Sequence, residues 1–297
     1  MCIRDSHRTR AFLKVQDGCD YKCSFCTIPL ARGKSRSNTI SNVIDNVHKI
    51  ASENIKEIVL TGINLGDFGA NSNDSIQYNF FDLVKELDKL DLSVRFRISS
   101  IEPNLLTDEI IEFISTSKNF VHHFHIPLQS GSDRVLKLMR RRYDSKLYNS
   151  RIKMINQLMP DACIGVDVIV GFPGEDDHEF LKSMSFIEDL DISYLHVFKY
   201  SERDNTHAIT LPKIVNSKIR TKRSKLLRLL SSRKKAGFYN KNIGTIHQVL
   251  FESEDKNGFI EGFSSNYVRF RRKWDSSLAG SIVESKFTKI DSEGFAI

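Results

Sequence analysis

Residues 18–26 read GCDYKCSFC, so that Cys19, Cys23 and Cys26 follow a C-x3-C-x2-C spacing. A cubane iron–sulfur cluster is held by cysteine thiolates and normally takes four of them. Three close cysteines without a fourth leave one iron with an open coordination site, which can bind a substrate or a cofactor. Residues 28–33, IPLARG, predict that the segment after the cysteines is a turn-rich loop. The stretch therefore predicts a metal cluster with an open site.

Other roles for these cysteines fit the sequence less well. Structural zinc normally takes four Cys or His ligands, and the nearest histidines, His7 and His48, do not sit at ligand spacing. Five cysteines cannot all pair, and nothing else resembles a small disulfide-rich protein. Cys163 lies in a predicted buried strand and is interpreted as a core residue, and Cys2 as incidental.

With Phe25 in front of the third cysteine, the motif resembles the signature of the radical S-adenosylmethionine (SAM) enzymes. The flanking residues FLKVQDGC (12–19) and RGKSRS (32–37) resemble the methylthiotransferases, in particular the branch that modifies threonylcarbamoyladenosine in tRNA. The resemblance runs from about Arg8 to the C-terminus. LTGIN (60–64) and ISSIEP (98–103) favour that branch. Methylthiotransferases of isopentenyladenosine tRNA or of a ribosomal protein remain alternatives, as does a non-catalytic, zinc-stapled RNA-binding module.

Length and charge limit the possibilities further. A chain of 297 residues can form one large α/β domain and a small one. The net charge of +7 suits a polyanionic partner. No apolar run approaches the length of a membrane span, so we expect a cytoplasmic protein, and a reducing compartment suits thiolates that hold a cluster.

From residue 10 to about 240 the patterns of strands and helices alternate. Some of the apolar runs are unbroken, as in parallel strands that are buried on both faces. Residues 40–50 and 80–90 show the i, i+3, i+4, i+7 spacing of amphipathic helices. Such alternation predicts an α/β fold with an incomplete β/α barrel. The resemblance implies a partial (β/α)6 radical-SAM barrel. The expected strands are 11–15, 55–60, 94–98, 123–128, 164–170 and 194–198.

We predict three segments. Residues 1–9 are expected to have no regular element, 10–240 to form the radical SAM domain, and 241–297 to form a small all-β module. The module resembles in position and size the TRAM domain, a small RNA-binding β-barrel. Ser132 is a predicted N-cap, and Asp176 with Glu179 a predicted capping box. Because only Cys2 precedes the core, we also expect the N-terminal auxiliary-cluster domain of the methylthiotransferases to be missing.

The resemblance also implies cofactor-binding residues at the ends of the predicted strands, where the loops of a β/α barrel gather. Gly62 matches the position where backbone approaches the methionine amino group of SAM. Ser99, Glu102, Gln129 and Ser130 match positions that line the SAM and substrate pocket. Phe25, Gly171 and Phe198 match positions that contact the adenine of SAM. His125 is interpreted as support for this pocket rather than as a metal ligand.

The implied chemistry starts at the [4Fe-4S] cluster, which would reduce SAM to methionine and a 5′-deoxyadenosyl radical. The radical would take a hydrogen from an adenine carbon, and C2 of N6-threonylcarbamoyladenosine at position 37 of tRNA would be methylthiolated. The sulfur would be associated with a second, auxiliary [4Fe-4S] cluster, expected only in a full-length protein. The implied partners are the tRNA anticodon loop and a reducing electron donor such as flavodoxin or ferredoxin. We expect a monomer and no membrane.

A basic aromatic stretch in the C-terminal module is the predicted RNA-binding surface, because Arg, Lys and exposed aromatic side chains suit phosphate contact and base stacking. Strand alternation puts Tyr267, Arg269 and Arg271 on the face opposite to Val268 and Phe270. The basic helical segment 217–241 is the second candidate. The predicted RNA-binding residues are Tyr267, Arg269, Arg271, Arg272, Lys273 and Trp274.

Overall fold

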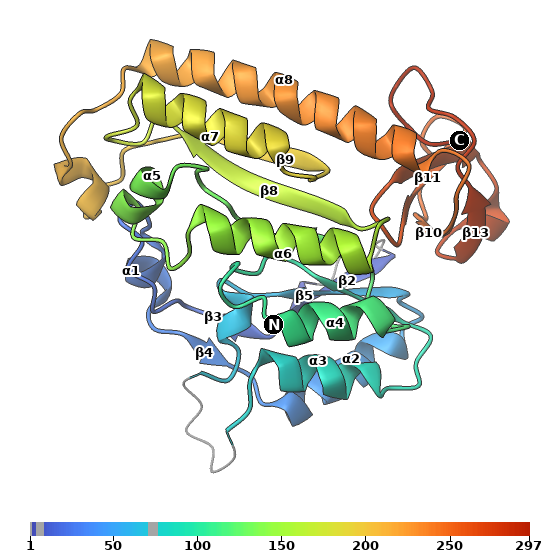
Figure 1. Cartoon of the computed structure of the whole chain (residues 1–297). Coiled ribbons are helices and arrows are strands. Elements are labelled where there is room, and N and C mark those ends of the chain that lie inside the picture. The colour runs from blue at the N-terminus through green and yellow to red at the C-terminus, as the bar shows by residue number, and fades with distance from the viewer. Residues whose placement is uncertain (1, 4–8, 71–76) are drawn as a thin grey trace.

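In a computed structural model that describes residues 2–3, 9–70 and 77–297, six parallel strands carry the larger part of the chain (Figure 1). These strands form two sheets, β2-β5-β6 and β7-β8-β9, and within each sheet neighbouring strands pair in parallel. Isolated parallel bridges, Phe96 to Phe120 and Ser100 to His125, join the two sheets. The strands are β2 (Arg10–Lys14), β5 (Glu57–Thr61), β6 (Arg95–Ile98), β7 (His123–His125), β8 (Cys163–Val170) and β9 (Tyr194–Lys199).

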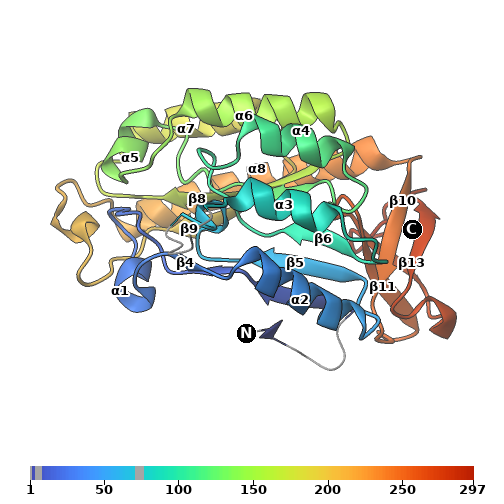
Figure 2. The same cartoon turned by 90° about the horizontal axis from the view of Figure 1, so that it is seen from below.

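Helices lie along these strands and pack their apolar stripes against them (Figure 2). Both predicted amphipathic helices form, and Val43, Val47 and Leu83 lie fully buried on their inner faces. The helices are α1 (Ile28–Arg32), α2 (Ile40–Ala51), α3 (Phe80–Asp88), α4 (Asp108–Thr116), α5 (Asp133–Leu138), α6 (Ser145–Leu158), α7 (Asp177–Asp189) and α8 (Ser217–Asn242). None of the helices within the described residues is long and apolar enough to cross a membrane.

The prediction that residues 1–9 have no regular element is wrong at Cys2–Ile3. These two residues form β1, which pairs antiparallel with Phe12 and Leu13 of β2. Pairing at an open sheet edge needs only backbone N–H and C=O groups, so a polar and patternless segment can supply it. Residues 4–8 lie outside the described residues.

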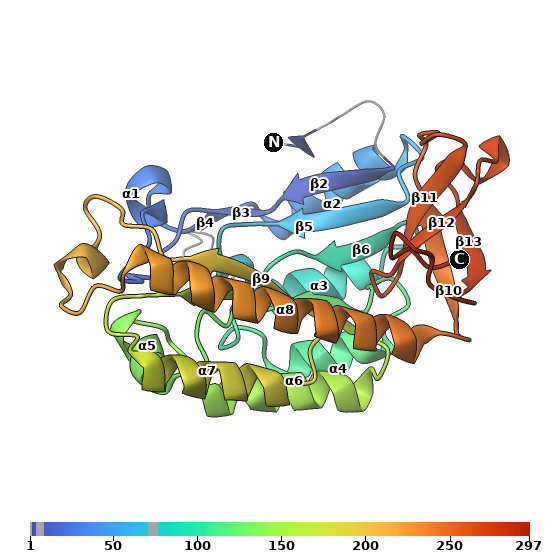
Figure 3. The same ribbon diagram turned by 90° about the horizontal axis from the view of Figure 1, so that it is seen from above.

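The C-terminal module is a four-stranded antiparallel sheet in the order β12-β11-β10-β13. It has its own small core, in which Val249, Ile260, Val268 and Phe270 are buried. Figure 3 shows α8 running along the parallel strands and leading directly into this module. Its strands are β10 (Ile246–Phe251), β11 (Phe259–Ser264), β12 (Arg269–Lys273) and β13 (Ile282–Lys286).

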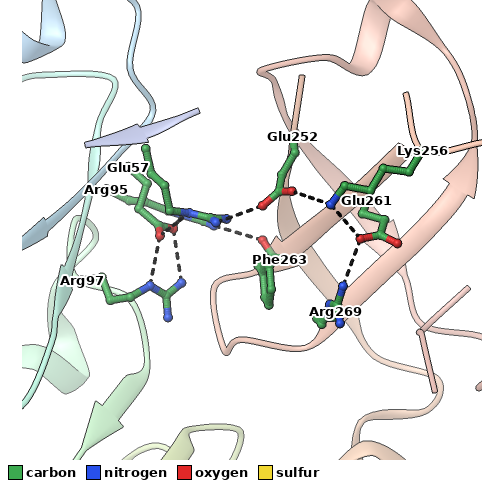
Figure 4. A network of polar contacts seen from close by, with 9 residues as sticks. Glu57, Arg95, Arg97, Glu252, Lys256, Glu261, Phe263 and Arg269 are labelled. Atoms are coloured by element: carbon green, nitrogen blue, oxygen red, sulfur yellow. Dashed lines mark hydrogen bonds and ion pairs between the residues drawn. The ribbon is translucent and has the colours of Figure 1, made fainter. Parts of the chain in front are cut away.

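Buried charge joins the two parts at the N-terminal ends of the parallel strands (Figure 4). Glu57 is fully buried and is paired with Arg10, Arg95 and Arg97 at 3.2, 2.7 and 3.0 Å. Arg95 also donates to the carbonyl oxygens of residues 248 and 263 in the module, each at 3.0 Å. Arg10 reaches Glu252 at 3.1 Å. The module is therefore held against the parallel strands by two of the arginines that share the buried Glu57.

Both predicted N-cap residues cap their helices. Ser132 caps α5 by accepting from the Val135 N–H, and Asp176 caps α7 by accepting from the Glu179 N–H at 3.0 Å. The prediction of a full capping box is wrong, because the Glu179 carboxylate accepts from the Ser132 hydroxyl and not from the Asp176 N–H. One carboxylate thus ties the starts of two helices together.

Candidate functional site

The cysteine loop, residues 18–27, is closed by a short hairpin-like pairing. β3 (Gln16–Asp17) pairs antiparallel with β4 (Arg36–Ser37), and the Cys19 N–H donates to the Gly33 carbonyl at 3.1 Å. Gly18 has φ +71°, and a Cβ there would lie 2.0 Å from the Lys34 carbonyl oxygen. A side chain at this position would be both strained and blocked by backbone. The loop is therefore fixed at its base.

Each of the three cysteine sulfurs accepts one N–H hydrogen bond. The Tyr21 N–H donates to Cys19 and the Ile28 N–H donates to Cys26, both at 3.4 Å. Arg141 Nη1 donates to the Cys23 sulfur at 3.2 Å. Burial raises the pKa of the Cys19 thiol to about 11 and also raises the pKa of Cys23. The free chain therefore keeps Cys19 and Cys23 as thiols, and a bound cluster would displace their protons.

This donor set fits a cubane cluster better than a single zinc ion. Thiolates on one tetrahedral zinc lie about 4 Å apart. The sulfur atoms of Cys19, Cys23 and Cys26 do not all lie within 4.8 Å of one another. N–H donors to sulfur also tune the reduction potential of an iron–sulfur cluster. Cys19, Cys23 and Cys26 would hold the cluster, and the donors around them would stabilise the thiolates.

Arg141 connects the cysteine loop to the end of β6. Besides Cys23 it contacts the Glu102 carboxylate and the Tyr143 hydroxyl, the latter at 3.1 Å. The Tyr143 hydroxyl in turn donates to the carbonyl oxygens that follow β7, at 2.8 and 2.9 Å. Arg141 stands in a run of three arginines, so nothing in the sequence distinguishes it from an exposed basic residue.

Gln16 is a second residue that the motifs do not reveal as part of the site. It is 1% exposed. Its Nε2 donates to the Gly18 carbonyl and the Ser35 hydroxyl at 2.8 and 2.9 Å. Its Oε1 accepts from the N–H groups of Ile63 and Asn64 at 2.8 and 2.9 Å. One amide therefore fixes the cysteine loop to the loop that follows β5.

Replacing Gln16 by alanine is expected to lower the free energy of unfolding by about 2–4 kcal/mol, because several buried backbone groups lose their partner. Cluster content after reconstitution should fall as well, since the base of the cysteine loop is released. Urea unfolding and iron analysis measure the two effects. The exposed Gln157 on α6 provides the matched control, and Gln157→Ala should change neither quantity. Equal stability of the two variants would contradict the role of Gln16.

The residues expected to bind the SAM methionine and the substrate occupy different surroundings. A Cβ on Gly62 would meet Gln16 Oε1 at 2.9 Å, so this backbone lies against the buried amide. Ser99 lines an inner cavity, and Glu102 contacts Arg141. Gln129 has φ +66° and a buried Oε1 without a hydrogen-bond partner in the described residues. The Ser130 hydroxyl is buried and accepts from the Ser132 N–H at 3.2 Å.

The residues expected around the adenine are also spread out. Phe25 makes an edge contact with Phe172, at 6.2 Å between ring centroids. Gly171 has φ +76°, and a Cβ there would lie 2.3 Å from the Arg220 side chain, so this glycine is needed for packing. Phe198 on β9 is 53% exposed. Arg141 thus links Glu102 to Cys23, and Gln16 links Gly62 to the cysteine loop. Gly171 instead lies against the Arg220 side chain of α8, and Phe198 faces solvent.

The inner cavity has a volume of about 380 Å³ and is lined by residues of all six parallel strands. His125 on β7 contacts the Ser100 hydroxyl at 2.8 Å through Nδ1 and Asp167 at 3.1 Å through Nε2. His125, Asp167 and His196 also bring their ligand atoms within 4.8 Å of one another. His125 thus lines this cavity, and its interpretation as pocket support stays a prediction.

The predicted RNA-binding residues are largely engaged within the protein. The alternation is as expected, since Val268 and Phe270 are buried, and the side chains on the opposite face contact other residues of the protein. Tyr267 lies against His123 at 4.4 Å between ring centroids and lines the inner cavity. Arg269 and Arg271 pair with Glu261 at 3.0 and 2.9 Å. The Arg269 side chain stays 43% exposed and that of Arg271 15%, so RNA binding by these residues stays a prediction.

The other basic candidates divide in a similar way. Lys273 is exposed, while Arg272 and Trp274 are half-buried. On α8, Arg220 and Arg223 are buried and paired with Glu202 and Glu175. The α8 lysines that remain exposed are Lys218, Lys222, Lys225, Lys235 and Lys241.

Comparison with known proteins yields one family and a set of relatives. A family described as the radical SAM superfamily matches residues 13–187. The threonylcarbamoyladenosine tRNA methylthiotransferase MtaB of Bacillus subtilis is 40% identical over 288 residues, which are 95% of this chain and 63% of that protein. The tRNA-2-methylthio-N(6)-dimethylallyladenosine synthase of the same organism is 33% identical and covers 94% of this chain and 55% of that protein. The chain spans less than two thirds of the length of these relatives.

Solved structures support the fold. Coproporphyrinogen III oxidase (HemN) from Escherichia coli aligns with a TM-score of 0.54 and 10% identity, covering 89% of this chain and 68% of that one. The radical SAM methyltransferase TsrM from Kitasatospora setae aligns with a TM-score of 0.53 and 14% identity, covering 63% of this chain and 34% of that one. At these identities the likeness concerns the arrangement of strands and helices alone.

Proposed function

We propose, since this chain belongs to the radical SAM superfamily, that it takes part in methylthiolation of C2 of N6-threonylcarbamoyladenosine at position 37 of tRNA. The carrying observation is the cysteine loop, in which Cys19, Cys23 and Cys26 each accept one N–H bond. Two relatives with 40% and 36% identity, from Bacillus subtilis and Aquifex aeolicus, bear the name of this activity. Because the relative named tRNA-2-methylthio-N(6)-dimethylallyladenosine synthase is 33% identical, tRNA with N6-dimethylallyladenosine is the alternative substrate.

The proposal includes a finer description of the fold. The order β2-β5-β6-β7-β8-β9 in parallel register supports a partial (β/α)6 barrel over residues 10–240. The antiparallel module of residues 241–297 would be a TRAM-like RNA-binding domain. We also propose a cytoplasmic location, a monomeric state and a reducing electron donor such as flavodoxin or ferredoxin.

When bound, the cluster with SAM at its open iron would supply the radical chemistry, which polar side chains cannot perform. The chain's own residues would position these groups. Arg141 holds the Cys23 sulfur and Glu102, so it fixes the cluster loop relative to the end of β6. Gln16 fixes the same loop relative to Gly62. Tyr267 lines the inner cavity beside His123 and would contact a group bound there.

Anaerobic reconstitution tests this function. We expect about four iron and four sulfide per chain, and formation of 5′-deoxyadenosine from SAM after reduction with dithionite. Formation should rise when tRNA carrying N6-threonylcarbamoyladenosine is added. Stoichiometric zinc without iron, and no 5′-deoxyadenosine, would instead support the non-catalytic RNA-binding module.

We further propose that the exposed part of the basic aromatic stretch, Arg272 to Trp274, contacts RNA phosphate. Replacing Arg272 and Lys273 by alanine should lower the slope of log affinity against log salt by about one unit per lost contact. Filter binding of tRNA at several salt concentrations measures the slope. Lys89→Ala on α3 is the matched control and should leave it unchanged. An unchanged slope in the double variant would contradict this proposal and would indicate that the exposed lysines of α8 bind the RNA instead.

A further inference from the structure

Two buried nitrogen atoms beside the inner cavity have no hydrogen-bond partner among the described residues. Arg97 is 4% exposed, and its Nη1 has no hydrogen-bond partner among the described residues. His123 is 6% exposed, and its Nδ1 is likewise without a partner among them. Both residues line the cavity. Buried polar atoms without partners are costly, so two of them at one cavity indicate a place for a ligand, and the guanidinium of Arg97 requires that this ligand accept a hydrogen bond.

The rest of the Arg97 guanidinium is held firmly. Its Nε and Nη2 donate to Glu57 at 3.0 and 3.2 Å, and its carbon lies 4.6 Å from the centre of the Tyr267 ring. The His123 ring lies against the same tyrosine with an interplanar angle of 40°, and its Nε2 contacts the Tyr194 hydroxyl at 3.3 Å. Burial holds the pKa of His123 well below its usual range, so the ring is neutral. In the tautomer whose Nε2 accepts from the Tyr194 hydroxyl, Nδ1 carries the ring proton and is a donor. These contacts fix the direction of both free groups.

Charge at this end of the cavity is unbalanced. The arginines at positions 10, 95 and 97 share the buried Glu57, and Glu252 adds one further carboxylate. Three guanidinium groups therefore face two carboxylates in this network, of which Arg10, Arg97 and Glu57 line the cavity itself. A ligand that brings a carboxylate would supply the missing charge and form a charge-assisted hydrogen bond with Arg97.

The other side of the cavity offers mixed polar groups. Asp167 on β8 lies opposite His196 on β9 in the strand register, and His125 lies beside them. Burial lowers the pKa of His196, so this ring is neutral at neutral pH and can donate or accept. Such a group suits hydroxyl and amide functions. It could also hold a cation, but His125 and Asp167 already contact each other directly at 3.1 Å.

We propose that the inner cavity binds the N6-substituent of the substrate adenosine and selects a threonylcarbamoyl group, whose carboxylate contacts Arg97 and His123. This inference rests on the proposed function and assigns its specificity to these residues. The hydroxyl and the amide of the substituent would contact Asp167 and His196. A dimethylallyl group is a hydrocarbon and would leave all of these groups desolvated and unpaired. A site built for polar groups rejects an apolar analogue for that reason.

The test compares anticodon stem-loop RNAs whose target adenosine carries threonylcarbamoyl, dimethylallyl or no substituent. Fluorescence anisotropy with the reconstituted chain should show about ten- to hundredfold tighter binding of the threonylcarbamoyl RNA than of the dimethylallyl RNA. Arg97→Gln should bring this ratio close to one. Because Arg97→Gln also disturbs Glu57, His123→Leu and His196→Phe provide further variants, and each should lower the ratio at least threefold. His48→Phe on the exposed face of α2 is the matched control and should keep the parent ratio.

Equal affinity of the parent chain for all three RNAs, with cluster and SAM cleavage intact, would overturn the inference and leave the proposed function standing. Absence of cluster and of SAM cleavage would instead remove the proposed function. Stoichiometric manganese or zinc that is lost in Asp167→Asn, combined with equal RNA affinities, would show that the cavity is a cation site and would also overturn the inference.

Discussion

Replacing Cys23 by alanine is expected to abolish the broad visible absorption of the reconstituted protein and to reduce its iron content to background. The same result is expected for Cys19→Ala and Cys26→Ala. Two remaining thiolates cannot hold a cubane that normally takes four ligands and here would have three from the chain. SAM cleavage should be lost together with the cluster, because SAM would bind at its open iron. Iron and sulfide analysis and visible spectroscopy measure the effect.

Cys163 provides the matched control. It is 2% exposed in β8 and outside the cysteine loop, and burial raises the pKa of its thiol to about 12. Cys163→Ala should cost some stability through the cavity it leaves, while the cluster content stays at the parent level. A full cluster in any of the three loop variants would remove that cysteine from the site and contradict the proposed ligand set.

The six parallel strands could be predicted because local sequence determines them. Runs such as residues 58–60 are apolar at every position, and all three side chains are buried in the structure. Ile58 and Leu60 belong to the hydrophobic core, and Val59 lines the inner cavity. Ser132 and Asp176 act as caps through N–H groups only three residues away. The fate of the Glu179 carboxylate was not predictable, because its partner Ser132 is 47 residues away.

The basic residues illustrate what sequence alone could not determine. Lys and Arg usually lie in solvent, so Arg220 on α8 and Arg271 on β12 were expected to form open basic faces. In the structure both side chains meet carboxylates far away in sequence or on another strand. Ion pairs of this kind depend on tertiary geometry and leave no periodic signal. The same limit applies to the site, where the cysteine spacing indicated the ligands but not the buried contacts of Gln16 and Arg141.

Replacing Glu57 by glutamine is expected to lower the free energy of unfolding by about 3–5 kcal/mol, since removal of one partner leaves buried charges uncompensated. The carboxylate is fully buried and pairs with Arg10, Arg95 and Arg97, and Arg95 also holds the C-terminal module. Denaturant unfolding measures the loss. Glu86→Gln is the matched control, because Glu86 forms only an exposed ion pair with Lys89 and should contribute less than about 1 kcal/mol.

The dependence of stability on pH gives an independent check of the same network. Burial alone would raise the pKa of Glu57, but the guanidinium groups of Arg97, Arg95 and Arg10 outweigh burial and hold it far below its usual range. A carboxyl group with a depressed pKa stabilises the fold above its unfolded value of about 4.3, and this contribution is lost as the pH falls below that value. The parent chain should therefore lose more stability than Glu57→Gln between about pH 5 and pH 3. Parallel pH profiles for the two proteins would mean that Glu57 titrates in the folded chain as it does in the unfolded one, and that the arginines are balanced by other groups.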